Sequence, residues 1–303
     1  MSELRFDGRV VVVTGAGRGI GRAHALAFAG RGARVVVADH GVGIDGRGSS
    51  TAPADEVAGE IGDGGGEAVA CHASVADEAG AAVIVATAIE RFGRLDVLVN
   101  NAGIHDPALF ADLSVERFRR MFEVHLFGTV LVTRAAWPHL VAAGDGRVVN
   151  TASEAMLGGI PQLTSYGAAK GAVFGLTRNL ATEGAAHGIR VNAIAPRADT
   201  RMSAADADRL AALFSLDPEA MAQVQASMPA DLCSPAAVYL GHASCPLTGE
   251  VLQVGMGGVA RLAVVHTEGI TKPGLTAEDI AGDIERILDV TGARVTASDT
   301  IET

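Results

Sequence analysis

The alternation of short apolar runs with longer helical segments constrains the fold of this chain more than any other feature. Six runs rich in β-branched residues are apolar nearly throughout: 9–14, 33–39, 67–71, 95–100, 146–151 and 189–194. Continuous apolar runs, unlike alternating ones, are typical of strands buried on both faces of a parallel sheet. Segments of helical length separate them: 19–31, 53–62, 75–92, 114–143, where we expect two helices, and 165–187. Because parallel neighbours need right-handed crossovers, we predict an α/β fold, a doubly wound Rossmann-type parallel sheet with helices on both faces.

The later segments are expected to extend the same domain. A strand at 249–255 returns to the sheet, so we place residues 1–258 in one domain. Within it, residues 197–233 carry Ala, Leu and Met between prolines, which indicates a mobile helical lid. A C-terminal extension follows at 259–303, with an amphipathic helix over 276–289 whose first residue is a suitable N-cap, Thr276.

Charge and composition exclude several classes of function. The net charge is −11, and no stretch gathers enough Lys or Arg to neutralise several phosphates, which argues against a nucleic-acid partner. No apolar run approaches the ~18 residues of a membrane span, and the N-terminus lacks the apolar core of a signal peptide. The three cysteines form no CxxC pair, which favours reduced thiols in a cytoplasm, and the nine histidines lack metal-ligand spacing, so we expect no metal.

A glycine-rich segment joins the first strand to the first helix. Gly15, Gly19 and Gly21 occupy this turn, and Asp39 ends the next strand. Such glycines let the backbone approach a pyrophosphate, and the later carboxylate accepts hydrogen bonds from the adenosine ribose. Asp39 would repel a 2′-phosphate and therefore favours NAD over NADP. Arg18 in the turn could pair with that phosphate and favours NADP. A chain with 38 glycines can match the glycine pattern by chance. The alternative that Asp39 only caps a strand and that Arg18 is solvated therefore stays open.

Tyr166 and Lys170 form an unusual pair in a chain with two tyrosines and two lysines. At positions i and i+4 of a helix their side chains share one face, about 5–6 Å apart. The pair is either an exposed surface contact or a reactive group. A free tyrosine has a pKa of about 10, and an adjacent cation lowers the pKa of an acid by roughly 1–3 units. Lys170 is therefore predicted to bring Tyr166 toward the working range of a general acid/base.

These segments, with NNAG at 100–103 and SYGAAK at 165–170, make residues 5–258 similar to the short-chain dehydrogenase/reductase family. The resemblance implies that 1–258 bind a dinucleotide, with 197–233 as the substrate lid. It implies that Tyr166 transfers the proton and that Lys170 holds the nicotinamide ribose. Ser153, thirteen residues before Tyr166, would orient the substrate oxygen. The cofactor-binding residues that it implies are Gly15, Arg18, Gly19, Ile20, Gly21, Asp39, Ser74, Val75, Asn101, Ala102, Gly103, Tyr166, Lys170, Pro196 and Thr200.

Three positions depart from the family pattern. His125 stands where the family usually has an asparagine whose backbone carbonyl anchors a water, so we count it as a candidate catalytic residue while favouring a structural role. Ser74 replaces an aspartate that often meets the adenine amino group. After Pro196 the usual glycine is Arg197, which leaves Thr200 as the expected contact to the nicotinamide amide.

Within the family, the chain is most similar to the (3R)-hydroxyacyl-CoA dehydrogenase part of peroxisomal multifunctional enzymes and to bacterial hydroxysteroid dehydrogenases. The segments 34–53 and 124–137 and the tail after 258 carry this likeness. It implies an NAD-dependent alcohol/ketone oxidoreductase, with Arg197 and Arg201 available for a CoA phosphate. Family members are commonly tetramers, so a homo-oligomer (tetramer or dimer) through 114–143 and 165–187 is expected. An NADPH-dependent 3-oxoacyl-ACP-type ketoreductase and a non-catalytic nicotinamide-binding regulator remain as alternatives.

Overall fold

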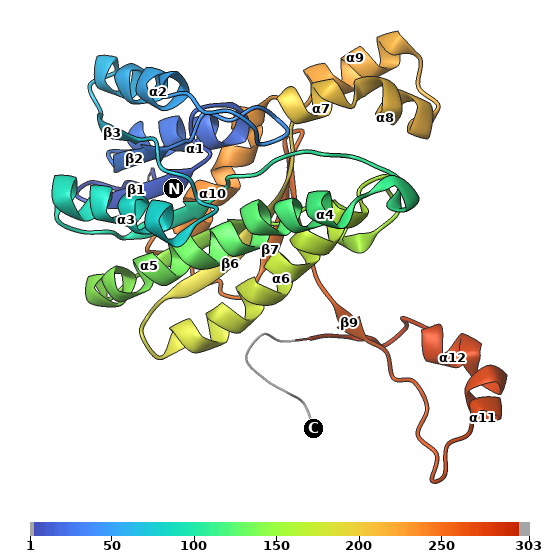
Figure 1. Cartoon of the computed structure of the whole chain (residues 1–303). Helices are drawn as coiled ribbons and strands as arrows, with labels where there is room; N and C mark the ends of the chain where they lie inside the picture. The colour runs from blue at the N-terminus through green and yellow to red at the C-terminus, as the bar shows by residue number, and fades with distance from the viewer. Residues whose placement is uncertain (1–2, 297–303) are drawn as a thin grey trace.

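An eight-stranded sheet organises the chain in the computed structural model, which describes residues 3–296 (Figure 1). Seven strands are parallel in the order β3-β2-β1-β4-β5-β6-β7, and β8 pairs antiparallel with β7. The strands are β1 (Val10–Thr14), β2 (Arg34–Ala38), β3 (Glu67–Cys71), β4 (Val97–Asn100), β5 (Arg147–Thr151), β6 (Arg190–Arg197), β7 (Val251–Gly255) and β8 (Gly258–Leu262). The predicted fold class is confirmed, and each predicted strand is present within a few residues of its expected bounds.

Helices cover both faces of the sheet and explain its continuous apolar strands. One face carries α1 (Gly19–Ala29), α2 (Ala52–Asp63) and α10 (Ser234–Gly241). The other carries α3 (Glu78–Phe92), α5 (Gly128–Ala143) and α6 (Thr164–Ala185). Along β1, Val11 and Val13 join the first cluster while Val10 and Val12 join the second. Successive side chains of a strand point to opposite faces, so burial of both faces requires every position to be apolar.

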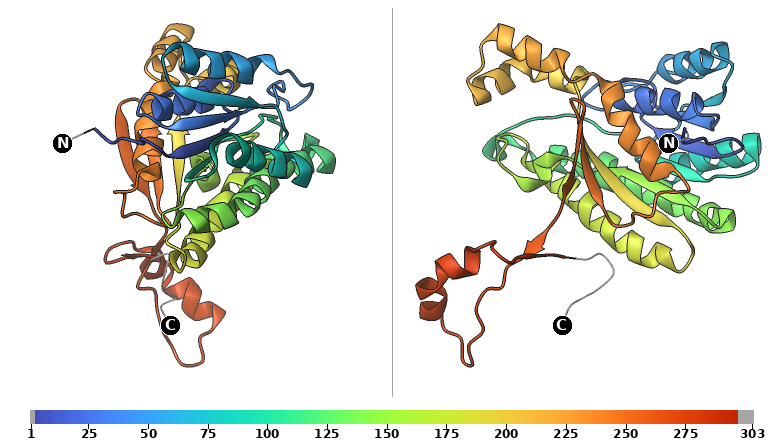
Figure 2. Two further views of the ribbon diagram at one scale, coloured as in Figure 1. Left: turned by 90° about the vertical axis from the view of Figure 1, so that its left-hand side faces the viewer. Right: turned by 180° about the vertical axis from the view of Figure 1, so that it is seen from behind.

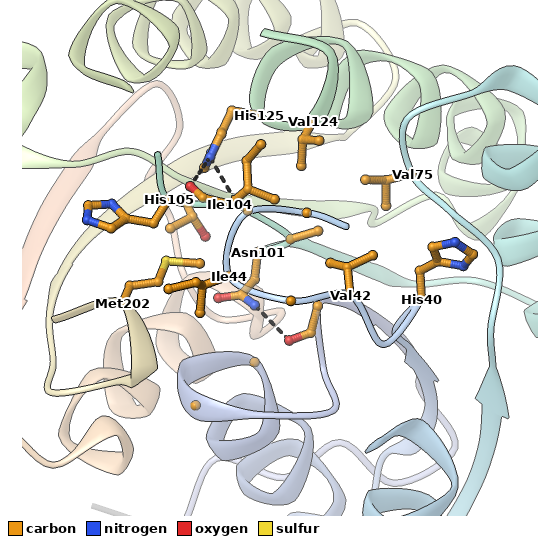
Figure 3. Close-up of a pocket in the computed structure, with 18 of the residues that line it drawn as sticks. His40, Val42, Ile44, Val75, Asn101, Ile104, His105, Val124, His125 and Met202 are labelled. Carbon is orange, nitrogen blue, oxygen red and sulfur yellow. Dashed lines mark hydrogen bonds between the residues drawn. The ribbon is translucent and has the colours of Figure 1, made fainter. Parts of the chain in front are cut away.

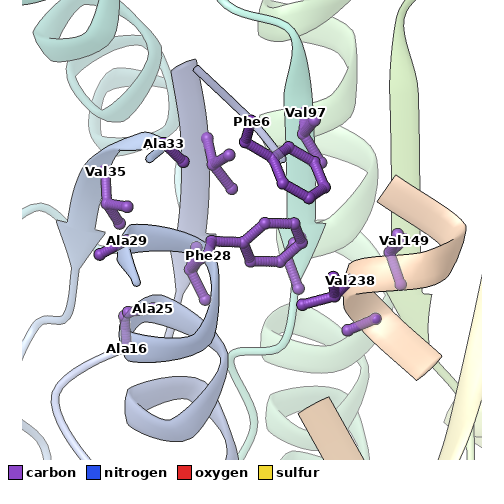
Figure 4. Close-up of a cluster of buried hydrophobic side chains, with 14 of the residues drawn as sticks. Phe6, Ala16, Ala25, Phe28, Ala29, Ala33, Val35, Val97, Val149 and Val238 are labelled. Carbon is purple, nitrogen blue, oxygen red and sulfur yellow. The ribbon is translucent and has the colours of Figure 1, made fainter. Parts of the chain in front are cut away.

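The helix α10 was not predicted from the sequence, yet it completes one of the two cores. Figure 4 shows Val238 of this helix beside the ring of Phe28 from α1. Phe28 also meets Phe6 edge to face, with ring centroids 5.0 Å apart. A Cβ added at Gly241 would lie 3.1 Å from the Phe28 ring, so the absence of a side chain permits this close packing.

The segment 114–143, predicted to hold two helices, is one continuous rod because a π-helical turn joins its two halves. It consists of α4 (Val115–Phe122), the turn Glu123–Phe127, and α5. Among the described residues, this rod alone is long and apolar enough, by length and composition, to cross a membrane, although our sequence criterion of an uninterrupted apolar run did not detect it. Val132, Ala136 and Leu140 are fully buried against the sheet, as in a core helix of a globular domain.

Two segments project from this body. The predicted lid contains α7 (Arg201–Ala205), α8 (Ala207–Phe214) and α9 (Pro218–Ala226), at the upper right of Figure 1. Beyond β8, an arm with the hairpin strands β9 (Val265–His266) and β10 (Arg294–Val295) extends away from the sheet, as both views of Figure 2 show. No strand was predicted in this tail.

The prediction of a single helix at 276–289 is wrong: the structure has two short helices there, α11 (Ala277–Gly282) and α12 (Ile284–Leu288). Asp283 interrupts it with a ψ of 17°, while its carboxylate pairs with Lys272 at 2.7 Å. Thr276 does cap the first helix, and its hydroxyl accepts a hydrogen bond from the backbone N of Asp279 at 3.1 Å. Residues 297–303 of the predicted extension lie outside the described residues.

Candidate active site

A pocket of about 940 Å³ opens at the carboxyl ends of the parallel strands. In doubly wound sheets ligands bind at this edge, where the strand order reverses, here between β1 and β4. The pocket is lined by every site residue predicted from the sequence except Ser153 and Arg197. Ser153 lies beside the pocket, at the start of the 3-10 turn that follows β5. The topology therefore brings together segments that are far apart in the chain.

The glycine turn and the NNAG segment interlock through close backbone contact. Gly15 has a φ of +63°, and a Cβ there would lie 2.8 Å from Cα of Ala102. A Cβ at Gly21 would be 2.1 Å from the carbonyl oxygen of Gly15, which no side chain tolerates. The side-chain amide of Asn101 donates to the carbonyl oxygens of Thr14 at 3.0 Å and Gly15 at 3.2 Å, and Figure 3 marks one hydrogen bond of this amide. These contacts form a narrow cradle that admits only backbone.

Asp39 holds the backbone at one end of the pocket, beside the glycine turn. One carboxylate oxygen accepts a hydrogen bond from the backbone N of Gly17 at 2.8 Å, and the other accepts one from Gly41 at 2.7 Å. Each oxygen keeps a further lone pair for ribose hydroxyls. Arg18 and Arg201 stand at the same end: burial lowers the pKa of Arg201, the positive charge of Arg18 lowers it further, and Asp39 opposes both.

Tyr166 and Lys170 lie on one face of α6, as their spacing predicted. The Lys170 ammonium is buried, donates to the carbonyl oxygen of Thr151 at 2.6 Å, and lies 5.7 Å from the centre of the Tyr166 ring. The hydroxyl of Ser153 accepts a hydrogen bond from the backbone N of Ala155 at 3.2 Å. This bond sets the serine side chain at the end of β5, beside Tyr166.

The pKa values of this pair differ from the sequence argument. Burial raises the pKa of Tyr166, and hydrogen bonding with Ser153 opposes the shift. Burial also lowers the pKa of Lys170 to about 7, so this lysine carries only part of its charge at neutral pH. The sequence argument expected Lys170 to lower the pKa of Tyr166, but burial raises this pKa and the opposing influence comes from Ser153.

His125 lies in the π-helical turn and is buried beside Tyr166. Its Nε2 is 3.0 Å from the backbone N and 2.9 Å from the carbonyl oxygen of Ile104, and Nδ1 has no partner among the described residues (Figure 3). Burial first, and then the charge of Lys170, lowers its pKa well below the usual value, so the ring is neutral. It meets the Tyr166 ring edge to face at 5.2 Å between centroids. This geometry gives His125 a packing contact with the tyrosine.

The remaining predicted residues line the pocket from three elements. Thr200 caps α7, and its methyl carbon would be 3.4 Å from a Cβ at Gly19, so the lid begins directly over the glycine turn. The Ser74 hydroxyl accepts a hydrogen bond from the backbone N of Ala76 at 3.1 Å and shapes the loop after β3. Pro196 contributes from the end of β6.

Arg197 does not serve as the free phosphate ligand that the sequence suggested. Its guanidinium makes two bonds to the Glu154 carboxylate, at 2.5 and 2.7 Å, so its charge is already neutralised. Arg201 lies at the adenosine end, beside Arg18 and Asp39. The CoA role suggested for these two arginines from the sequence stays a prediction.

Sequence reasoning missed two further parts of the pocket. The loop 41–53 folds over it: Ile44 accepts a hydrogen bond from the backbone N of His105 at 2.7 Å, and Arg120 donates to the carbonyl oxygen of Gly46. His105 lines the substrate side. The glycine content predicted a loop but gave no sign of where it folds. Within residues 3–296 no group of three or more His, Cys, Asp or Glu side chains is placed to hold a metal ion.

Comparison with known proteins agrees with this geometry. The family model described as short chain dehydrogenase matches residues 9–210. Over 96% of its length the chain is 41% identical to the peroxisomal multifunctional enzyme type 2 of Mus musculus, and it spans 38% of that enzyme. A crystal structure of a short chain dehydrogenase from Mycobacterium avium matches with a TM-score of 0.76 and 41% identity, covering 93% of this chain and 95% of that one.

A second solved structure adds a ligand. It is a 7α-hydroxysteroid dehydrogenase complexed with NADH and 7-oxo glycochenodeoxycholic acid, with a TM-score of 0.71 and 31% identity. The match covers 85% of this chain and 98% of that one.

Proposed function

This chain belongs to the short-chain dehydrogenase family, and from that premise we propose that it is an NAD-dependent oxidoreductase that interconverts a secondary alcohol and a ketone. One observation carries the proposal. Tyr166, Lys170 and the glycine turn line the same pocket, and Ser153 stands beside Tyr166. A general acid/base therefore lies next to a cradle of the shape that a dinucleotide needs.

The residues of the cradle fit a nicotinamide dinucleotide. Backbone N–H groups at the start of α1, exposed by Gly15 and Gly19, would hold its pyrophosphate. The remaining lone pairs of Asp39 would accept the adenosine ribose hydroxyls, and Lys170 would donate to the nicotinamide ribose. When bound, the nicotinamide accepts or returns the hydride.

The chain's own groups handle the proton. In oxidation, Tyr166 takes the proton of the substrate hydroxyl as the carbinol carbon gives up its hydride; in reduction the same hydroxyl returns it. Because burial raises the pKa of Tyr166, the tyrosine is a ready proton donor at neutral pH and needs nearby positive charge to act as a base. Ser153 would donate a hydrogen bond to the substrate oxygen and stabilise its developing charge.

The cofactor choice is tested by kcat/KM with NAD and NADP. We expect a clear NAD preference, since the ionised Asp39 would face a 2′-phosphate. Asp39→Ala should narrow or reverse this preference because Arg18 and Arg201 then meet the phosphate without an opposing charge. Equal kcat/KM for the two cofactors in the unmutated protein would contradict the assignment and would favour the NADPH-dependent 3-oxoacyl-ACP-type ketoreductase.

For the substrate we propose a secondary alcohol on a bulky, mainly apolar scaffold, a 3-hydroxyacyl-CoA or a hydroxysteroid. The support is the sequence resemblance to both groups and the hydroxysteroid dehydrogenase among similar structures. The test is kcat/KM with NAD across medium-chain hydroxyacyl-CoAs, hydroxysteroids and sugar alcohols. A sugar alcohol that exceeds every apolar substrate tenfold, about 1.4 kcal/mol of transition-state binding, would overturn it.

We make two further proposals, one on the oligomeric state and one on the location in the cell. The exposed Phe127 and Val141 on the rod formed by α4 and α5 support a homo-oligomer through this surface. The three cysteines are free and buried, which supports a cytoplasmic location, although the mouse relative is named as peroxisomal.

A further inference from the structure

The lid is tied to the rest of the substrate side at one buried carboxylate, that of Asp206. This residue follows α7 and is 7% exposed. It accepts a hydrogen bond from Nε2 of His105 at 2.7 Å and another from the guanidinium of Arg209. Arg209 also donates to the carbonyl oxygen of Pro161 at 3.0 Å, in the loop before α6. Three segments that surround the substrate side therefore meet at Asp206.

The charge of this carboxylate is stabilised. Burial alone would raise the pKa of Asp206, but hydrogen bonding with Arg209 and the influence of His105 outweigh it, and the pKa is lowered. An ionised carboxylate can only accept hydrogen bonds. The proton in the contact between His105 and Asp206 therefore belongs to Nε2 of the imidazole.

The other ring nitrogen of His105, Nδ1, belongs to a side chain that borders the pocket. The side chain is 10% exposed, lines the pocket and meets the ring of Tyr166 edge to face, with centroids 6.4 Å apart. Nδ1 has no hydrogen-bond partner among residues 3–296, yet it is not enclosed as Nδ1 of His125 is. Figure 3 draws His105 on the same side of the pocket as Met202 of the lid. In the neutral imidazole with a proton on Nε2, this nitrogen is a hydrogen-bond acceptor.

We propose that His105 determines substrate specificity: Asp206 of the lid fixes its tautomer, and Nδ1 accepts a hydrogen bond from a second donor group of the substrate. The inference rests on the proposed function and narrows its substrate class to alcohols that carry such a donor. The amide N–H of a pantetheine thioester is a donor of this kind. Asp206 is then a positioning residue. Because it belongs to the lid, the lid must lie against the pocket for His105 to be held in this tautomer.

Two thioesters of 3-hydroxybutyrate test the acceptor. The N-acetylcysteamine thioester carries an amide N–H, and the S-ethyl thioester lacks the acetamido group. We expect the unmutated enzyme to prefer the first in kcat/KM, and His105→Phe, which keeps a ring without an acceptor, to reduce that preference about tenfold through KM. His105→Gln, which retains an acceptor oxygen, should restore part of it. An unchanged preference in His105→Phe would overturn the proposal.

Asp206→Asn tests the positioning role, with Asp208→Asn as the matched control. Asp208 is an acid of the same lid, and the side-chain amide that replaces the Asp206 carboxylate could donate to Nε2 and release the tautomer. Asp206→Asn should lose the thioester preference and speed hydrogen–deuterium exchange over 201–213 and 104–109, while the control does neither. Exchange at the unmutated rate in Asp206→Asn would refute the tie. If neither thioester reacts with the unmutated enzyme, the proposed substrate class fails, and the exchange experiment still decides the tie.

Discussion

At the scale of single residues, burial determines the chemistry of the site more than neighbouring charges do. Lys170 is enclosed, with a hydrogen bond to the carbonyl oxygen of Thr151, and its pKa falls to about 7. The pKa of Tyr166 moves the other way for the same reason. A charged group loses its hydration on burial, so acids become weaker and cationic bases lose their protons more readily. Burial therefore favours the neutral form of both side chains.

The first residue-scale prediction concerns proton transfer. Tyr166→Phe keeps the ring that packs against His125 and removes the hydroxyl. We expect kcat to fall at least about 100-fold, the lower range for general acid–base catalysis, while the dissociation constant of NAD stays the same. Steady-state kinetics and a fluorescence titration of cofactor measure the two quantities. A near-normal kcat in a folded variant would refute the mechanism.

The second concerns the pH dependence of stability. The folded-state pKa of Lys170 lies at about 7, below its ordinary value of 10.5, so between these pH values the unfolded chain binds the extra proton. The burial penalty is full below about pH 7 and disappears as the pH rises toward 10.5. Lys170→Met should therefore raise Tm most at about pH 6.5 and progressively less at about pH 8 and 9.5, while activity is lost. A Tm difference that is independent of pH would contradict this, as melting curves at the three pH values would show.

At the scale of elements, the site depends on how closely two loops approach. The turn after β1 and the loop after β4 meet at Gly15 and Gly21, where the backbone and the Asn101 side chain leave no space for a Cβ. The same approach creates the cradle, because Asn101 ties the carbonyl groups of the turn back toward β4. The glycines of the turn are thus needed for the packing of the two loops as well as for binding a ligand.

A matched pair of glycine variants tests this requirement. In Gly21→Ala the new Cβ would meet the Gly15 carbonyl oxygen at 2.1 Å, so we expect a lower Tm and loss of cofactor binding. Gly59→Ala, in the middle of α2 with no atom near its Cβ, should instead stabilise the fold by about 0.5–1 kcal/mol. Urea unfolding and a cofactor titration distinguish them. Equal effects of the two changes would show that the contact at Gly21 does not matter.

At the scale of the whole molecule, large apolar side chains are exposed on two parts of the surface. Exposed apolar side chains occur on the rod, at Val115, Phe127 and Val141, and again along the arm, at Val264 and Leu288. Large exposed apolar patches commonly mark protein interfaces. The rod, which is long and apolar enough to cross a membrane, thus has one buried face and one exposed face.

We expect the exposed face of the rod to lie in a homo-oligomer interface. Changing Phe127 and Val141 together to Glu should shift the protein to a smaller species, because desolvated carboxylates would face each other across the contact. The control is Val83→Glu, an equally exposed apolar position on α3. Sedimentation velocity measures the species. The assignment of this surface would be wrong if both variants sediment like the unmutated protein.

Much of the architecture was determined by the sequence alone. Continuous apolar runs predicted buried parallel strands, and the strand, the glycine turn and the helix predicted where a dinucleotide would bind. These features are local: a strand buried on both faces must be apolar throughout, and Tyr166 and Lys170 share a helix face whatever surrounds it. The sequence resemblance added Ser153, whose distance along the chain carries no geometric information.

Only the tertiary structure decided the electrostatics and the substrate side. The pKa shifts of Tyr166 and Lys170 result from enclosure by residues distant in the chain, which spacing does not encode. The pairing of Arg197 with Glu154 joins side chains 43 residues apart, and that of His105 with Asp206 joins side chains 101 residues apart. Such contacts exist because crossovers carry separate loops to one edge of the sheet. Local pattern determines which side chains a segment presents, and the packing of the whole chain determines which of them meet.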